Sequence, residues 1–259
     1  MHILGIDIGG SGIKGAIVDT NTGNLVSERL RIATPQPSTP PRVADVVLDI
    51  VQQHGYDGPV GCCMPSVVVD GQARTAANID KSWRGTQADA VFRDVTGKAF
   101  TVLNDADAAA VAEMAIGAGR GLGGLVITVT IGTGLGSGVH YRGRLVPNVE
   151  IGHMPGKDGQ SIERYASDRA RKVNDLSWPE WGERFDYFLR KATRVMSPDH
   201  FILGGGASKK LELFEEQLTV DVPIHVARFR NNAGIIGAAL AANPAIDTTD
   251  LSTGPGSES

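Results

Sequence analysis

Hydrophobic residues along the chain form short runs separated by glycine-rich or polar turns, which is the pattern of buried strands. The runs HILGIDI (2–8) and IKGAIVDT (13–20) predict two strands joined at GGSG, and the turn NTGN leads to a third strand over 25–34. Later runs predict further strands in PVGCCM (59–64), FTVLND (100–105), GLVITVTI (124–131), LGSGVHY (135–141), HFILGG (200–205) and VPIHVA (222–227).

Segments with helical spacing lie between these strands. Residues 42–54 are apolar at Val43, Val46, Val47, Ile50 and Val51, which predicts a helix. Other helices are predicted over the alanine-rich stretch 105–119 and near 161–174, 179–196, 209–218 and 231–243. The mixture of strands and helices predicts an α/β protein.

A strand–glycine–strand pattern occurs twice, about 120 residues apart. HILGIDIGGSGIKGAIVDTNTG near the start is echoed by GLVITVTIGTGLGSGVHYRGRL from residue 124. Two copies at this distance predict two related halves rather than a solenoid.

Composition and charge narrow the class of protein. The chain has 259 residues, with 25 lysines and arginines against 29 aspartates and glutamates, a net charge of −4. This weakly acidic balance argues against general nucleic-acid binding. No apolar run reaches the ~18 residues of a membrane span, and no signal-peptide pattern opens the chain, so we expect a cytoplasmic protein without a membrane partner. Cys62 and Cys63 are adjacent on a predicted strand, where they are interpreted as packing residues on opposite faces.

The loop GGSGIKG (9–15) matches the spacing of a dinucleotide-binding fingerprint. That fingerprint requires a helix after the glycines, to hold a pyrophosphate on its N-terminal amides. Here a strand and a turn follow instead, which argues against a dehydrogenase, and the Walker A pattern is absent. A hairpin with a glycine tip can still bind phosphate through its backbone amides, and TIGTGLGSG (130–138) offers a second such tip.

These motifs resemble a known family. GIDIGGSGIKGAIVD (5–19) is similar to the first phosphate motif of the actin and hexokinase superfamily, and more narrowly to that of the ROK sugar kinases. The resemblance continues in family order through NDADAAA, TIGTGLGSG, EIGH, IERYAS and ILGGGAS and covers nearly the whole chain. Within the family, the chain is most similar to the compact polyphosphate glucokinases and polyphosphate/ATP glucomannokinases.

The resemblance implies a ribonuclease H-like (actin-like ATPase) fold with two related domains, a mixed sheet in each and a cleft between them. We expect a smaller N-terminal domain over 1–104, completed by the closing helix 233–243, and a larger domain over 105–232. The small, polar residues 244–259 predict a disordered tail.

The resemblance also assigns roles around the phosphate donor. Asp105 is the expected base that accepts the proton of the sugar 6-hydroxyl; the plain alternative is a helix-capping aspartate. Asp7 is expected to help place Mg²⁺ through water. Lys14 either neutralises phosphate charge or lies on the hairpin surface. The expected phosphate contacts are Gly9, Gly10, Ser11, Gly12, Lys14, Gly132, Thr133 and Gly134, and those on the nucleotide side are Gly204, Gly205, Gly206 and Ala207.

Sugar contacts follow from the same comparison. They are expected at Asn78, Asn104, Asp105, Glu150, His153 and Glu163. Many ROK proteins place a zinc-binding cysteine cluster after the histidine, but GHMPGKDGQSIERYAS contains no cysteine, so no structural zinc is expected. What holds this loop in place of zinc is not visible in the sequence.

The resemblance implies a kinase that moves a phosphoryl group from inorganic polyphosphate or ATP to glucose, and by extension to mannose. A polyphosphate chain would need a basic track. The candidates are Arg164, Arg169, Arg171, Lys172, Lys209, Lys210, Arg228 and Arg230, each of which could equally be a solvated surface residue. The alternatives are a strictly ATP-dependent kinase and a sugar-responsive repressor. A repressor is disfavoured because the first strand begins by His2, which leaves no space before it for a helix-turn-helix. A homodimer would fit the family.

Overall fold

The computed structural model describes residues 1–247 and divides into two compact units. Among the described residues, the first unit contains Met1–Ala112 and 232–247, and the second contains Glu113–Asn231. The helix α3 (Asp105–Ile116) therefore belongs in part to each unit. The tail predicted from residue 244 lies mostly outside the described residues. No helix among the described residues is long and apolar enough to cross a membrane.

The first unit is built on a five-stranded mixed sheet in the order β3-β2-β1-β4-β7. Its strands β1 and β2 are antiparallel and pair Asp7 with Lys14, whereas β4 lies parallel to both β1 and β7. The bounds are β1 His2–Ile8, β2 Ile13–Asp19, β3 Leu30–Ile32, β4 Val60–Met64 and β7 Phe100–Asn104. A separate two-stranded sheet joins β5 (Val68–Val69) and β6 (Gln72–Ala73).

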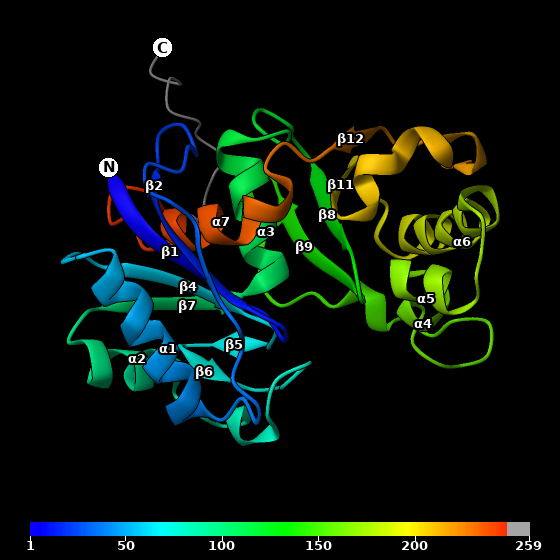
Figure 1. Cartoon of the computed structure of the whole chain (residues 1–259). Helices are drawn as coiled ribbons and strands as arrows, with labels where there is room; N and C mark the ends of the chain where they lie inside the picture. Colours follow the sequence, from blue (N-terminus) through cyan, green and yellow to red (C-terminus); the bar gives the residue numbers. More distant parts are fainter. Residues whose placement is uncertain (248–259) are drawn as a thin grey trace, which may run out of the picture. The chain divides into compact units, whose positions relative to one another are not determined.

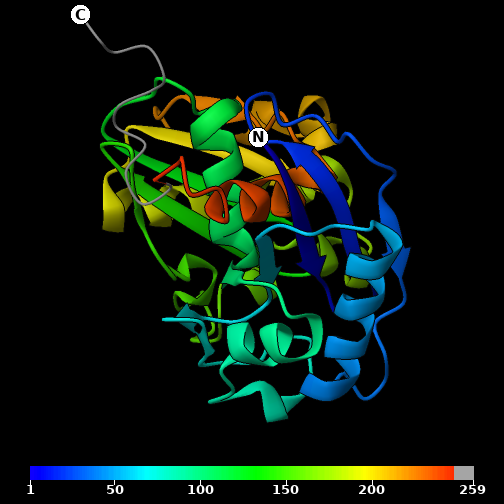
Figure 2. The same ribbon diagram turned by 90° about the vertical axis from the view of Figure 1, so that its left-hand side faces the viewer.

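Helices cover both faces of this sheet (Figure 1). The helices α1 (Pro40–Gln53) and α2 (Ala88–Thr96) pack on one face, where Val47 and Phe92 join the largest core cluster of the unit. On the other face lie α7 (Ala233–Ala241) and the first turns of α3, and Figure 2 shows α7 running across β1. Cys62 contributes to the first cluster and Cys63 to the second, which confirms that the two thiols are packing residues on opposite faces.

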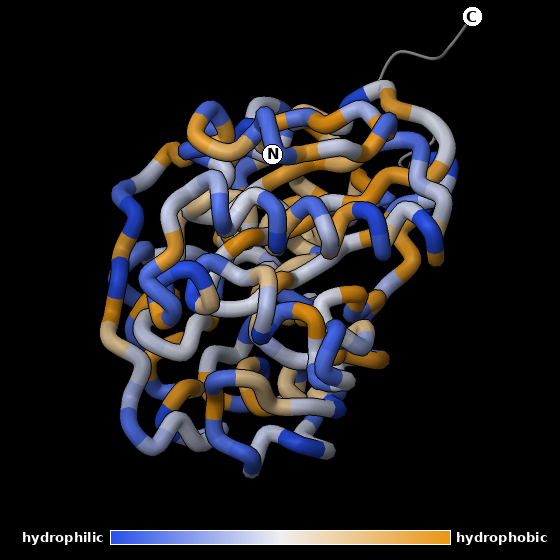
Figure 3. The backbone as a smooth tube through the Cα atoms, turned by 90° about the vertical axis from the view of Figure 1, so that its right-hand side faces the viewer, coloured by the Kyte–Doolittle hydropathy of each residue, from blue (hydrophilic) through white to orange (hydrophobic). Residues whose placement is uncertain are grey.

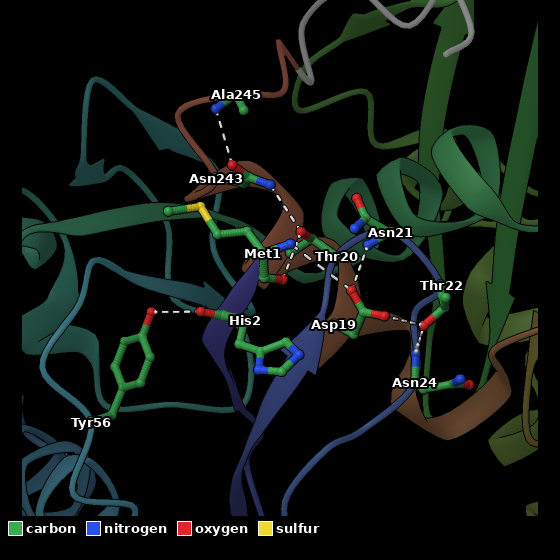
Figure 4. A network of polar contacts seen from close by, with 10 residues as sticks. All are labelled: Met1, His2, Asp19, Thr20, Asn21, Thr22, Asn24, Tyr56, Asn243 and Ala245. Carbon is green, nitrogen blue, oxygen red and sulfur yellow. Dashed lines mark hydrogen bonds and ion pairs between the residues drawn. The ribbon is translucent and has the colours of Figure 1, made fainter. Parts of the chain in front are cut away.

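The closing helix is tied to the far end of the first hairpin (Figure 4). Beyond the C-terminal end of α7, the Asn243 side-chain amide donates to the Thr20 hydroxyl, which itself donates to the carbonyl oxygen of Met1; both distances are 2.9 Å. Asp19 accepts bonds from the Asn21 amide and the Thr22 hydroxyl and so forms the turn. The last described segment of the chain is thereby part of the first unit.

The second unit repeats the sheet of the first. Its strands follow the order β10-β9-β8-β11-β12, again with an antiparallel hairpin of three strands and two parallel additions. The bounds are β8 Leu125–Ile131, β9 Leu135–Tyr141, β10 Arg144–Val146, β11 His200–Gly205 and β12 Ile224–Val226. The equivalent sheet order confirms the two related halves and the mixed sheets predicted from the sequence.

One face of the second sheet is covered by α4 (Glu163–Ala166), α5 (Asp168–Val173) and α6 (Trp178–Met196). The α6 helix begins at a capping box, in which Ser177 and Glu180 satisfy each other's backbone amides. Its hydrophobic residues recur at helical spacing, and the colouring of the backbone in Figure 3 shows such alternation along the helices of this side. Trp181 packs edge-on against Phe214, with ring centroids 4.8 Å apart.

Three predicted elements differ in the structure. The strand predicted over 25–34 shortens to β3, because the Ser27 hydroxyl takes the bond from the Ile17 amide and interrupts the ladder. The helix predicted near 161–174 is broken into α4 and α5 at Ser167, which has an extended backbone and caps α5 through its hydroxyl.

The helix predicted over 209–218 is wrong. This stretch forms two 3₁₀ segments, η3 (Ala207–Leu213) and η4 (Glu215–Gln217). Phe214 between them leaves helical geometry, with φ −144°, and its side chain is fully buried among the aromatic rings of α6. Burial of the Phe214 ring therefore outweighs the helical pattern of residues 209–218. The prediction also missed α2 and the small β5–β6 sheet.

Candidate functional site

The first glycine loop (residues 9–12) is a tight turn that a hydrogen bond from Thr34 stabilises. Within it, the Gly9 amide donates to the Gly12 carbonyl oxygen at 3.0 Å, and the Thr34 hydroxyl donates to the Gly9 carbonyl oxygen. A Cβ atom at Gly10 would lie 2.7 Å from the backbone oxygen of Asn78, so only glycine allows this approach. The loop thus brings a predicted phosphate contact and a predicted sugar contact side by side.

Asp7 and Lys14 form an ion pair at the base of this loop. Their side chains lie opposite each other across β1 and β2, with Nζ of Lys14 2.8 Å from Oδ2 of Asp7. The other carboxylate oxygen is 3.8 Å from Sγ of Cys63, and burial raises the pKa of that thiol well above its usual range. Of the two roles left open for Lys14, the structure shows a side chain held at the candidate metal carboxylate rather than a solvated hairpin residue.

Arg31 also belongs to the surroundings of this loop and was not among the predicted site residues. Its guanidinium donates to the Ser11 carbonyl oxygen at 3.2 Å and lies against Gly12. Arg31 pairs with Lys14 across β2 and β3, so the strand register places a second cation beside the loop. The sequence signal was present, since Arg31 lies in the third predicted strand, but only pairing of that strand with the second reveals it.

Asp105 is the first residue of α3. The cap of this helix is Asn104, whose side-chain oxygen accepts bonds from the amides of Ala106 and Asp107 at 2.8 and 3.1 Å. The side-chain amide of Asn104 donates to the Ser66 carbonyl oxygen, which fixes its orientation. Asp105 itself accepts from the Ala106 amide through Oδ1. Asn104 therefore performs the main capping, and the half-buried carboxylate of Asp105 is positioned at the positive end of the helix.

The second glycine loop carries a direct link to Glu163. Its turn is closed by the Gly132 amide, which donates to the Gly134 carbonyl oxygen at 3.0 Å, and Thr133 at its tip is exposed. The Leu135 amide donates to Oε2 of Glu163 at 3.3 Å, and any Cβ at Gly134 would collide with that carboxylate. Gly134, a predicted phosphate contact, and Glu163, a predicted sugar contact, are thus adjacent.

Three of the predicted sugar contacts interact with one another. Nε2 of His153 lies 3.7 Å from Oε1 of Glu163, and the His153 amide donates to the Glu150 carbonyl oxygen at 3.0 Å. Desolvation raises the pKa of the Glu150 carboxyl, the charge of Glu163 raises it further, and His153 opposes both effects. The structure therefore brings Glu150, His153 and Glu163 into one electrostatically coupled group.

The loop between His153 and Glu163 is held by cations on aromatic rings. Nζ of Lys157 lies 4.9 Å from the ring centroid of Tyr187 and 5.4 Å from that of Tyr165, and Arg184 covers Tyr165 at 4.7 Å. The Lys191 ammonium donates to the Pro155 carbonyl oxygen. A backbone bond from Ile162 to the Met154 carbonyl oxygen closes the base of the loop. These contacts show what holds this loop, which the sequence left open.

The predicted nucleotide-side residues end β11 and begin η3. Gly205 has φ +80° and packs against the backbone of Ile131, so this turn depends on glycine. The Ser208 hydroxyl donates back to the Gly205 carbonyl oxygen at 2.9 Å. A glycine and a side-chain hydrogen bond therefore define this turn, which follows directly from β11.

The predicted site residues form two groups, one in each unit. The first unit holds Asp7, residues 9–12, Lys14, Asn78, Asn104 and Asp105, and the second holds residues 132–134, Glu150, His153, Glu163 and residues 204–207. Each group is assembled by contacts within its own unit.

The residues of the first group fit a magnesium ion bound mainly by substrate. Among the described residues, no cluster of three or more metal-ligating side chains occurs. Mg²⁺ in kinases keeps several waters and takes one or two carboxylates plus the donor phosphates, so the single carboxylate of Asp7 beside the phosphate loop is compatible with it.

Comparison with known proteins agrees with this arrangement. The ROK family model matches residues 3–170, and the chain belongs to this family. A polyphosphate glucokinase from Mycobacterium tuberculosis is 44% identical over 249 residues, which cover 96% of this chain and 93% of that protein.

Two solved structures extend the comparison. An inorganic polyphosphate/ATP-glucomannokinase from Arthrobacter sp. strain KM has a TM-score of 0.87 and 43% identity over 92% of this chain and 96% of its own. A ROK family glucokinase from Streptomyces griseus, in complex with glucose and AMPPNP, has a TM-score of 0.79 and 26% identity over 93% of this chain and 99% of its own. These neighbours bear out the actin-like fold predicted from the motifs.

Proposed function

We propose that this protein is a polyphosphate- and ATP-dependent glucokinase that phosphorylates the 6-hydroxyl of glucose. The observation that carries the proposal is the 44% identity to a polyphosphate glucokinase over 96% of the chain. The geometry supports the proposal. Asp105, the two glycine loops and the pair of His153 and Glu163 all lie in the motifs that define the family resemblance.

Asp105 is the proposed base. The carboxylate lies at the N-terminus of α3, where Asn104 caps the helix and Asp105 accepts a bond from the Ala106 amide. It accepts the proton of the 6-hydroxyl as the oxygen attacks the terminal phosphorus of the donor. The bond from that phosphorus to the bridging oxygen breaks, and ADP or a polyphosphate shorter by one phosphate leaves. Phosphoryl transfer needs positioning and charge neutralisation more than covalent chemistry, so one base and well-placed amides are sufficient.

The sugar contacts are proposed from the family motifs. Asn78 and Asn104 belong to the first unit, and Glu150, His153 and Glu163 belong to the second. A hexose presents a ring of hydroxyls that both carboxylates and the imidazole can bind. Mannose, which differs from glucose in the orientation of one hydroxyl, is proposed as a second substrate.

The donor phosphates are proposed to contact the amides of residues 9–12 and 132–134. Lys14 and Arg31 add positive charge on the first loop. Mg²⁺, placed by Asp7 through water, would neutralise charge on the donor phosphates. For an ATP donor, residues 204–207 would lie beside the nucleoside. A cytoplasmic location and a homodimer are proposed as in the sequence analysis.

Initial rates with four substrate pairs test the proposal: glucose and mannose, each with ATP and with long-chain polyphosphate. We expect glucose 6-phosphate to form with both donors. Turnover with ATP alone would favour the rival, a strictly ATP-dependent glucokinase. Absence of turnover with every pair, together with glucose-dependent DNA binding, would favour a sugar-responsive repressor.

A further inference from the structure

A cavity of about 340 Å³ opens beside the second glycine loop, entirely within the second unit. Eight residues line it: Thr133, Glu163, Arg164, Ser167, Arg169, Ala170, Val173 and Asn174. Its volume is at the lower end of the range for small-molecule sites. The cavity thus includes a phosphate-loop residue, a predicted sugar contact and two arginines.

The residues that line the cavity favour an anionic chain as the ligand over a nucleobase. None of the eight residues is aromatic, so the cavity offers no ring on which a nucleobase could stack. Two guanidinium groups, two hydroxyls and a side-chain amide supply donors, and Glu163 is the one acid that lines it. Glu163 is already engaged by the Leu135 amide and His153. Guanidinium groups bind phosphate oxygens in a bidentate geometry, which suits a chain of phosphates.

Both arginines are positioned by the structure around them. The backbone amide of Arg169 donates to the Gly132 carbonyl oxygen at 3.3 Å, which joins α5 to the second glycine loop. The guanidinium of Arg164 bonds to the side chain of Gln160 in the loop that follows His153. Both arginines are exposed residues and so are available to a ligand that enters from solvent.

The other basic residues predicted for the track have different contacts or lie outside the cavity. Arg171 and Lys172 both pair with the buried carboxylate of Asp168, at 2.9 and 2.6 Å, and Arg171 also covers the ring of Trp178 at 4.1 Å. Arg228 donates to the Ile116 carbonyl oxygen. Lys209, Lys210 and Arg230 lie outside the lining of the cavity. Of the basic-track candidates from the sequence, only Arg164 and Arg169 line this cavity.

We infer that the cavity holds the part of a polyphosphate donor that lies beyond its reacting end, with Arg164 and Arg169 as its ligands. The inference rests on the proposed function. The reacting phosphate lies at the Thr133 loop near Glu163, and the chain continues over Ser167 and past the two arginines. A phosphate chain long enough to reach them gains contacts that the three phosphates of ATP do not make.

Kinetics of the full-length protein test this inference, with the variants Arg169→Gln and Arg164→Gln. The matched control is Arg194→Gln, which removes an exposed arginine of α6 outside the cavity. We expect each cavity variant to raise the KM for long-chain polyphosphate roughly tenfold, the effect of one lost charge-assisted hydrogen bond. The KM for ATP and the KM for glucose should change less than about twofold, as should every parameter of the control.

The outcomes separate the inference from the proposed function. Turnover of polyphosphate by the wild-type protein, with no selective rise in KM in either cavity variant, would overturn the inference alone. Equal rises for polyphosphate and ATP would also overturn it, because the arginines would then bind phosphates common to both donors. Wild-type turnover with ATP but none with polyphosphate would overturn the polyphosphate donor and the inference together. Melting temperatures of all variants exclude a loss of folding.

Discussion

Nζ of Lys14 lies 2.8 Å from Oδ2 of Asp7, across the first two strands and below the first glycine loop. Both side chains are largely buried, with 27% and 18% of their surfaces exposed, so this pair is less screened than a surface ion pair. The candidate metal carboxylate is therefore held in place by a residue of the hairpin that forms the loop.

Asp7→Asn should raise the Mg²⁺ concentration that gives half-maximal rate, because one negative charge near the donor phosphates is lost. We expect a rise of about tenfold, corresponding to roughly 1.4 kcal/mol. The measurement is initial rate against Mg²⁺ at saturating glucose and ATP. Asp57→Asn is the matched control, since Asp57 pairs with Lys98 at the surface of the same unit. An unchanged Mg²⁺ requirement in Asp7→Asn would remove Asp7 from the metal site.

Asp105→Asn tests the base with little disturbance of the helix. An asparagine oxygen can still accept the bond from the Ala106 amide, and Asn104 still caps α3. We expect kcat to fall by about 10²–10⁴, the usual contribution of a general base. Glucose binding, measured by calorimetry, should stay within about threefold of wild type. A variant with nearly normal turnover would show that another group accepts the proton.

Gly134→Ala should displace the carboxylate of Glu163, because a Cβ at this position collides with it. We expect the KM for glucose to rise about tenfold through the lost sugar contact, equivalent to roughly 1.4 kcal/mol. Gly123→Ala is the control, since a Cβ there meets nothing within 4 Å. If both variants bind glucose as the wild type does, Glu163 does not contact the sugar.

Lys157→Met should loosen the loop that carries His153. The substitution keeps a long side chain but removes the charge that lies over Tyr165 and Tyr187, a contribution of about 0.5–1 kcal/mol. We expect a several-fold rise in the KM for glucose with little change in kcat, together with faster amide exchange over 154–161. Lys98→Met, which alters a surface pair in the other unit, serves as the control. Unchanged exchange would show that the backbone bonds alone hold the loop.

Because His140 is buried, we predict that the free energy of unfolding falls in mild acid. Its side chain is buried in β9, neither ring nitrogen has a hydrogen-bond partner among the described residues, and desolvation lowers its pKa to about 4. The unfolded chain binds a proton near pH 6.5 and the folded protein does not, so the unfolded state gains free energy of protonation as the pH falls from 6.5 toward 4. Stability should therefore be full above pH 7 and fall below it.

Between pH 7.5 and 5 this single histidine should lower the free energy of unfolding by about 2 kcal/mol. The measurement is urea unfolding at both values for wild type and for His140→Gln, a polar side chain that does not titrate. The variant is expected to be less stable at pH 7.5 but to lose about 2 kcal/mol less on acidification. Equal losses in the two proteins would show that folding does not lower the pKa of His140.

The repeating hairpins, the α/β class and the family could be predicted from the sequence alone. Apolar runs interrupted by glycine specify buried strands and tight turns through local chemistry, so β1, β2, β8 and β9 were predicted almost residue by residue. The position of Asp105 at the start of a helix followed from the alanine-rich run after it. In each case the signal lies within a few neighbouring residues.

The remaining features depend on contacts between residues that are distant in the sequence. Burial of Phe214 against α6 replaced a predicted helix by 3₁₀ turns, and the bond from Ile17 to Ser27 shortened a predicted strand. Strand register brought Arg31 to the first loop, and helix packing set Lys157 over two tyrosines. Side-chain partners across strands and helices depend on burial and pairing energies summed over the whole unit, which a local pattern does not contain.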